Sequence, residues 1–137
     1  FIFILFSILP SKKNLESSEL NWMPFSEKVL LKSIQSNQPI FVDFTADWCL
    51  TCKVNEKTVI NRTQTKSFFK KNNFILIKAD WTTKDTEITN YLASIKRSGV
   101  PVYILMIPPY YKPIILPEIL TLSTIYETYQ NRLGDNK

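Results

Sequence analysis

The chain has 137 residues, of which 45% are hydrophobic and 21% are charged, and its formal net charge is +5. This length and composition fit one folded domain with its own hydrophobic core and exclude disorder for most of the chain. The lysines and arginines are scattered among acidic residues and form no basic stripe, so we expect no nucleic-acid partner.

The chain opens with the apolar run FIFILFSILP and no initiating Met, so we expect more chain upstream. This run is shorter than the roughly 20 residues that cross a bilayer. We interpret residues 1–23 as the end of a membrane span followed by a polar tether. Two other interpretations of the apolar run fit less well. A signal-peptide core would need a preceding basic stretch and a cleavage site, and neither is visible. A buried core strand would not be separated from the domain by the polar residues that follow this run. Lys12 and Lys13 favour a cytoplasmic location for the residues that follow this span.

The remainder, residues 24–137, alternates helical and strand patterns as one domain. Apolar spacings of three and four predict helices, and short β-branched runs predict strands. Ser26 or a neighbour could cap the first helix, and Gly99 is placed to end the fourth. The predicted order is helix 25–36, strand 40–45, helix 49–59, helix 63–71, strand 74–79, helix 85–98, strand 102–107, strand 113–117 and helix 122–133. This α/β alternation predicts a mixed sheet with helices on both faces, parallel at the crossovers and antiparallel at the last pair.

The two cysteines of the chain, Cys49 and Cys52, follow the strand 40–45 and open a helix. A structural zinc site needs four Cys or His ligands, and the chain has no His, so such a site would need a dimer or carboxylates. A bridge that closes so short a loop stabilises little. A redox dithiol explains both the spacing of the cysteines and their place at the start of a helix. A helix N-terminus favours a thiolate at Cys49, and Cys52, one turn later, can resolve a mixed disulfide.

The runs FVDFTADWCLTCKVNEKTV, KADWT, SGVPVYIL and LPEILT, over about residues 22–133, resemble the C-terminal thioredoxin-like domain of DsbD-type thiol:disulfide interchange proteins. The resemblance implies a thioredoxin-like fold and a protein-disulfide reductase with no cofactor besides the Cys49–Cys52 dithiol. It also implies a domain on the periplasmic side of the bacterial inner membrane. There the domain would take electrons from a membrane-embedded domain and pass them to a periplasmic protein disulfide.

Five further residues enter the predicted site. Strand alternation places Asp43 on one face with Phe41 and Thr45, and the resemblance implies that it is buried beneath the dithiol, where it would have a raised pKa and exchange the proton of Cys52. Glu56, one turn after Cys52, would oppose thiolate formation. The alternatives are a solvated strand-end carboxylate for Asp43 and an ordinary surface residue for Glu56.

The other three predicted residues are Trp48, which would shield the dithiol, and Val100 and Pro101. The resemblance implies a cis bond between Val100 and Pro101 and a backbone edge at Val100 that pairs with an extended substrate segment. Packing alone for Trp48 and a trans proline that starts a strand are the alternatives.

Two departures from the family pattern stand out. PPYYKP replaces the usual glycine turn between the last two strands, and Leu50-Thr51 separates the cysteines without proline or histidine. Two other functions therefore stay open: an independent membrane-tethered thioredoxin, for example one that acts in cytochrome c biogenesis by reducing the apocytochrome, and a redox-inactive binding module.

Overall fold

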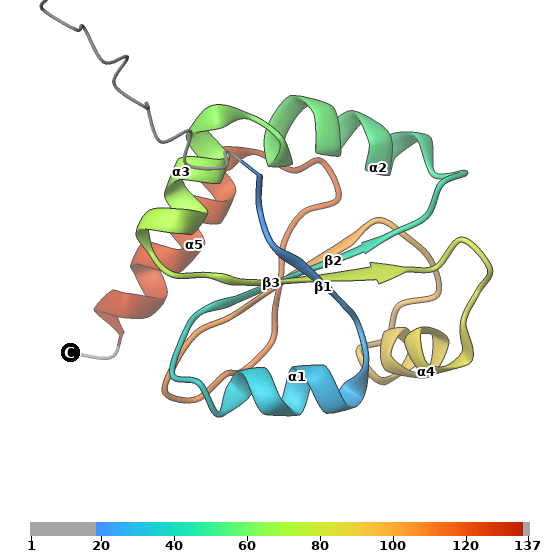
Figure 1. Cartoon of the computed structure of the whole chain (residues 1–137), viewed down its shortest axis with the longest axis horizontal. Coiled ribbons are helices and arrows are strands. Elements are labelled where there is room, and N and C mark those ends of the chain that lie inside the picture. Colours follow the sequence, from blue (N-terminus) through green and yellow to red (C-terminus); the bar gives the residue numbers. More distant parts are fainter. Residues whose placement is uncertain (1–18, 136–137) are drawn as a thin grey trace, which may run out of the picture.

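The computed structural model describes residues 19–135, which form a five-stranded mixed sheet with helices on both faces (Figure 1). The strands lie in the order β1-β3-β2-β4-β5. β1 and β2 pair with β3 in parallel, whereas β4 runs antiparallel to both β2 and β5. The elements are β1 (Trp22–Pro24), α1 (Glu27–Ile34), β2 (Ile40–Thr45), α2 (Leu50–Asn55), the π-helical segment η1 (Glu56–Ile60), α3 (Thr63–Lys71), β3 (Ile75–Asp80), α4 (Thr86–Ser94), β4 (Val102–Met106), β5 (Ile114–Ile115) and α5 (Leu122–Gly134).

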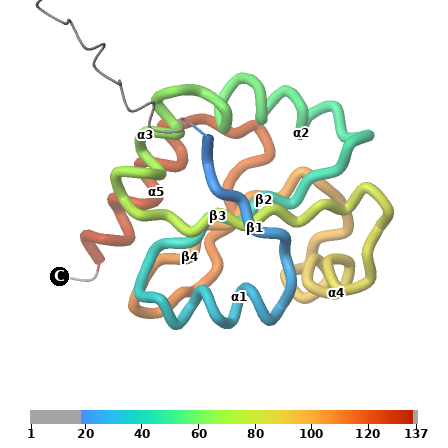
Figure 2. Tube along the Cα trace, viewed as in Figure 1, coloured from blue at the N-terminus to red at the C-terminus, as the bar shows by residue number. Residues whose placement is uncertain are grey.

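The sheet separates two hydrophobic clusters. Even-numbered residues of β2, such as Val42 and Phe44, pack towards α1 and α4, and Phe41 packs on the opposite face with residues of η1, α3 and α5. Figure 2 shows the same arrangement, with α1 and α4 on one side of the sheet and α2, α3 and α5 on the other. Every residue of β2 and β4 is buried, which explains why both strands read as largely apolar runs. The predicted mixed sheet between two helical layers is confirmed.

Several local predictions are also confirmed. The Ser26 side chain accepts a hydrogen bond from the Val29 backbone N–H at 3.0 Å and so caps α1. The run around Ile114 pairs antiparallel with β4, as expected for the last two strands.

Three features differ from the prediction. β1 was not expected, and Trp22 and Met23, which we assigned to the tether, belong to the sheet because they pair with β3. The helix that follows the cysteines is α-helical only to Asn55 and continues as η1, with a bond from the Asn61 N–H to the Glu56 carbonyl. α4 ends at Ser94, five residues before Gly99, because Lys96 takes the left-handed conformation that turns the chain.

The proposed membrane-span residues 1–10 lie outside the described residues. Within residues 19–135, no helix is both long and apolar enough to cross a bilayer.

Candidate functional site

Cys49 and Cys52 form a disulfide at the start of α2. Cys49 is the N-cap residue, and its Sγ accepts a hydrogen bond from the Cys52 backbone N–H at 3.2 Å. Cys49 retains 7% exposure and Cys52 has none. Cys49 is thus the less buried of the two cysteines and lies at the start of the helix, while its role as the attacking sulfur stays a prediction.

The Val100–Pro101 peptide bond is cis, which confirms the geometry that the resemblance implied. Pro101 is buried, and the half-buried Val100 packs against the cluster of Ala46, Cys49 and Cys52. The loop that precedes β4 is thereby brought from about fifty residues away in the chain to the side of the disulfide. A second cis bond, Pro108–Pro109, lies in the PPYYKP loop and was not expected.

Asp43 is buried with 1% exposure, so its prediction as a solvated strand-end carboxylate is wrong and its prediction as a buried acid is confirmed. It pairs in register with Lys78 of β3 and Tyr103 of β4. Neither carboxylate oxygen has a hydrogen-bond partner within the described residues. Burial raises the pKa of this carboxyl from 3.8 to about 7; the charge of Lys78 lowers the pKa, and that of Glu56 raises it.

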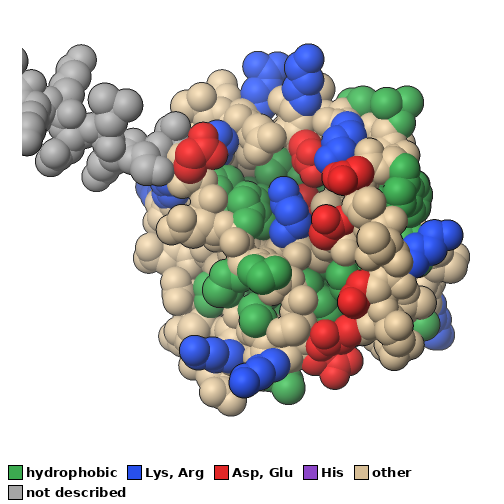
Figure 3. All heavy atoms as spheres, turned by 45° about the vertical axis from the view of Figure 1, so that its right-hand side comes forward, with side chains coloured by type: hydrophobic (Ala, Val, Ile, Leu, Met, Phe, Trp, Pro, Cys, Tyr) green, Lys and Arg blue, Asp and Glu red, His purple; other side chains and the backbone are tan. Residues whose placement is uncertain are grey.

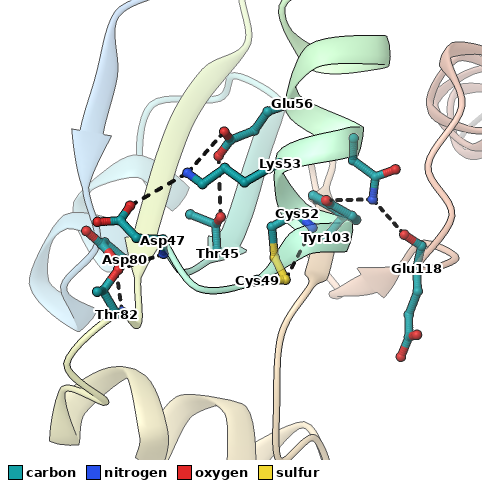
Figure 4. Close-up of a disulfide and its surroundings, with 11 residues drawn as sticks. Thr45, Asp47, Cys49, Cys52, Lys53, Glu56, Asp80, Thr82, Tyr103 and Glu118 are labelled. Atoms are coloured by element: carbon teal, nitrogen blue, oxygen red, sulfur yellow. Dashed lines mark hydrogen bonds and ion pairs between the residues drawn. A yellow bond between two sulfur atoms is a disulfide. The ribbon is translucent and has the colours of Figure 1, made fainter.

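Glu56 points back to the sheet from the first residue of η1 (Figure 4). The Thr45 hydroxyl donates to Glu56 Oε1 at 3.3 Å, and Lys53 Nζ lies 3.4 Å from Glu56 Oε2. Its side chain is only 18% exposed. Glu56 is therefore a partly buried acid on the same sheet face as Asp43, and its effect on thiolate formation stays a prediction.

Trp48 is 55% exposed and belongs to a small cluster beside the cysteines. Its indole N–H donates to the Thr82 carbonyl at 3.0 Å, and its ring lies 6.0 Å from that of Trp81. The Thr82 hydroxyl accepts from the Asp47 backbone N–H at 2.9 Å. The segment just before Cys49 is thus held by the β3–α4 connection. Shielding of the dithiol by Trp48 stays a prediction.

Asn55 is a buried residue that the sequence analysis missed. Its amide donates to the Tyr103 hydroxyl at 2.9 Å and to the Glu118 carbonyl at 2.7 Å, and its side-chain oxygen accepts from the Leu120 N–H at 3.3 Å. These bonds join α2 to β4 and to the loop that precedes α5 (Figure 4). The one available signal was a polar residue three positions after Cys52, on the inward face of the helix.

No group of three or more His, Cys, Asp or Glu residues suited to a metal ion occurs between residues 19 and 135. The cis-proline loop packs against the disulfide, and the buried acid lies on the sheet face that α2 and η1 cover. This arrangement can carry out dithiol–disulfide exchange, because it combines an accessible sulfur, a second sulfur one helical turn behind it and a group that can hold a proton near neutral pH.

Comparison with known proteins agrees with this description. A family model described as thioredoxin-like matches residues 21–108, and the chain therefore belongs to the thioredoxin-like family. The thioredoxin-like fold implied by the resemblance is confirmed. No curated protein sequence matches the chain.

Solved structures share the fold at low sequence identity. The reduced C-terminal domain of DsbD from Neisseria meningitidis is similar over 80% of this chain and 98% of that domain, with 19% identity and a TM-score of 0.63. A thioredoxin from Thermus thermophilus covers 83% of this chain and 87% of its own, with 14% identity and a TM-score of 0.63. The oxidoreductase DsbH covers 81% and 83%, with 18% identity and a TM-score of 0.64.

Proposed function

We propose that this domain is a thiol-disulfide oxidoreductase that reduces the disulfide of a partner protein. One observation carries the proposal: the accessible sulfur of Cys49 caps α2 and lies beside the cis-proline loop, with Cys52 buried behind it. The residues themselves supply the electrons as a dithiol, so the reaction needs no dissociable cofactor.

In the reduced protein, the Cys49 thiolate attacks one sulfur of the partner's disulfide. That bond breaks, the partner's other sulfur leaves as a thiolate, and a mixed disulfide joins Cys49 to the partner. Cys52 then loses its proton and attacks the Sγ atom of Cys49. The mixed disulfide breaks, and the partner's sulfurs take up two protons. The partner has gained two electrons, and the domain is left with the Cys49–Cys52 disulfide.

Asp43 fits the role of proton acceptor for Cys52. It lies on the sheet face that α2 and η1 cover, since Thr45 on that face bonds to Glu56 and Tyr103 bonds to Asn55. Burial raises its pKa to about 7, so it can bind and release a proton under neutral conditions. Glu56 adds negative charge on the same side and would oppose ionisation of the dithiol.

The loop of Val100 and Pro101 would position the partner. In this proposal the Val100 backbone pairs with an extended segment that carries the partner's disulfide, and the exposed Trp48 covers the other side of that segment.

We further propose that the domain works as the C-terminal domain of a DsbD-type protein. It would face the periplasm from the bacterial inner membrane, accept electrons from a membrane-embedded domain and pass them to a periplasmic protein disulfide. The sequence motifs around Cys49 and the apolar start of the chain support this placement. An independent tethered thioredoxin remains the alternative.

The catalytic proposal is tested with Cys52→Ala. Without the resolving sulfur, this variant should accumulate a mixed disulfide with a model protein substrate such as insulin, detected as a reductant-sensitive adduct. Cys49→Ala is the matched control and should form none. Reduced wild-type protein should reduce the substrate without accumulating the adduct. Absence of both reduction and adduct would favour a redox-inactive binding module.

The cellular placement needs a separate test. A reporter that is active in only one compartment, fused to the C-terminus of the full-length protein, should report the periplasm. A cytoplasmic signal would remove the proposed donor and acceptor. The number of membrane spans encoded upstream separates the two oxidoreductase proposals, because a DsbD-type protein has many spans and a tethered thioredoxin has one.

A further inference from the structure

Lys53 follows Cys52 directly and lies between two carboxylates. Its Nζ is 3.6 Å from Asp47 Oδ1 and 3.4 Å from Glu56 Oε2. Asp47 belongs to the segment before Cys49, and Glu56 opens the segment that follows α2. Lys53 therefore connects the chain on both sides of the cysteine pair, and Figure 4 shows its ammonium group between these two acids.

The side of the molecule around Lys53 is rich in carboxylates although the chain is basic overall. Figure 3 shows acidic side chains in a band on one side of the molecule, with Lys or Arg side chains among and beside them. The charge of Lys53 acts on Asp43 and Asp80 as well as on its two ion-pair partners. The titratable and charged groups around the dithiol on its own and neighbouring elements are Asp43, Asp47, Lys53, Glu56, Lys78, Asp80, Lys84 and Tyr103.

The ion pair of Lys53 with Asp47 is poorly placed to stabilise the fold. The side chains of Lys53 and Asp47 are 44% and 78% exposed, and exposed pairs contribute little to folding. Lys53 adjoins Cys52 in the chain, and its ammonium group joins the segments on either side of the pair whose chemistry depends on forming a thiolate. A positive charge nearby favours the thiolate, and surrounding carboxylates oppose it.

We propose that Lys53 is a positioning residue of the dithiol: its ammonium group holds the Asp47 segment and Glu56 around Cys49 and Cys52 and offsets their negative charge, so that reduced Cys49 ionises under neutral conditions. This inference rests on the proposed function, because it concerns the fraction of Cys49 that is present as the reactive thiolate. It assigns to Lys53 no contact with the partner or with the reacting sulfurs.

The test uses reduced protein and follows alkylation of Cys49 by iodoacetamide against pH, with the modified peptide quantified by mass spectrometry. The scan runs from about pH 6 to about pH 11, on both sides of the ordinary thiol pKa near 8.5. In Lys53→Met the midpoint should move to higher pH, and the rate at neutral pH should fall about three- to tenfold, as expected for loss of one nearby charge. Lys53→Arg should restore the wild-type profile.

Two further variants separate charge from general disturbance of α2. Lys57→Met removes an exposed lysine of η1 that has no ion pair within the described part of the chain, and it should leave the midpoint unchanged. Asp47→Asn removes one partner but keeps the ammonium group, so its midpoint should move to lower pH, opposite to Lys53→Met.

A Lys53→Met profile that coincides with that of the wild type would overturn the inference, and so would an equal shift in Lys57→Met. Insulin reduction by the wild type is measured in parallel. If Cys49 is alkylated normally but the protein reduces no protein disulfide, the proposed function fails. The inference about Lys53 is still decided by the alkylation profiles of the variants.

Discussion

Replacement of Asp43 by Asn should make the stability of the protein less dependent on pH. Burial raises the pKa of this carboxyl from 3.8 to about 7 in the folded protein, and the unfolded chain keeps the ordinary value. Between these values the folded state binds more protons than the unfolded state, so wild-type stability falls as pH rises. Below about pH 4 both states are protonated and the cost is absent.

The size of this effect follows from the two pKa values. The interval between 3.8 and about 7 corresponds to at most about 4 kcal/mol, reached above pH 7, where the carboxylate is charged in both states. Asn has nearly the same shape and carries no charge. Because neither oxygen of Asp43 has a partner within residues 19–135, the change to Asn breaks no hydrogen bond described there.

Urea unfolding of the oxidised proteins measures the difference directly. The disulfide removes thiol titration from the comparison. Asp43→Asn should match the wild type within about 1 kcal/mol near pH 4 and exceed it by several kcal/mol near pH 8. Glu56→Gln should shift the wild-type transition to lower pH, because the Glu56 charge raises the pKa of Asp43. A difference between Asp43→Asn and wild type that stays constant from pH 4 to pH 8 would refute the reasoning.

Other predictions concern the supports of the site. Asn55→Ala leaves three partners without their hydrogen bonds in a buried region. It should therefore lower the free energy of unfolding, measured by urea titration, by about 3 kcal/mol. The control variant Asn61→Ala, at an exposed position, should cause no measurable change. A loss no larger than that of the control would show that these bonds contribute nothing. Thr82→Val removes the acceptor of the Asp47 N–H and should cost about 1 kcal/mol while increasing hydrogen exchange at Asp47; unchanged exchange there would contradict the proposed anchoring.

Much of the fold is visible in local sequence patterns. Largely apolar runs predicted β2 and β4, because both strands are buried on both faces, and four-residue spacing with a serine cap predicted α1. β1 escaped prediction since its three residues show no alternation and become a strand only by pairing with β3, about fifty residues away in the chain. Such a pairing is a tertiary effect that no short window contains.

Turns were less predictable than strands. Gly99 was expected to end a helix, yet the left-handed positions among the described residues belong to Asn37, Asn73, Lys84, Lys96 and Tyr111. The π-helical geometry of η1 likewise has no compositional signature, since EKTVI would continue an ordinary α-helix equally well.

The site residues also divide into those that the sequence identified and those that it did not. Cys49 and Cys52 were identified from their spacing, and the burial of Asp43, which the resemblance implied, is confirmed. Asn55 and Lys53 were not singled out because their importance lies in partners on other segments. The Asn55 bonds reach residues 48 and 63 to 65 positions away, and their existence depends on how α2 sits over β4.

The unequal exposure of the two sulfurs determines how electrons can enter and leave the domain. Cys49 keeps 7% exposure and Cys52 has none, so in the proposed reaction the donor and the acceptor would both form their bond with Cys49. They would then exclude each other, and turnover by the proposed reaction should follow a ping-pong scheme in which one must depart before the other arrives. At saturating concentrations, each should act as a competitive inhibitor towards its counterpart.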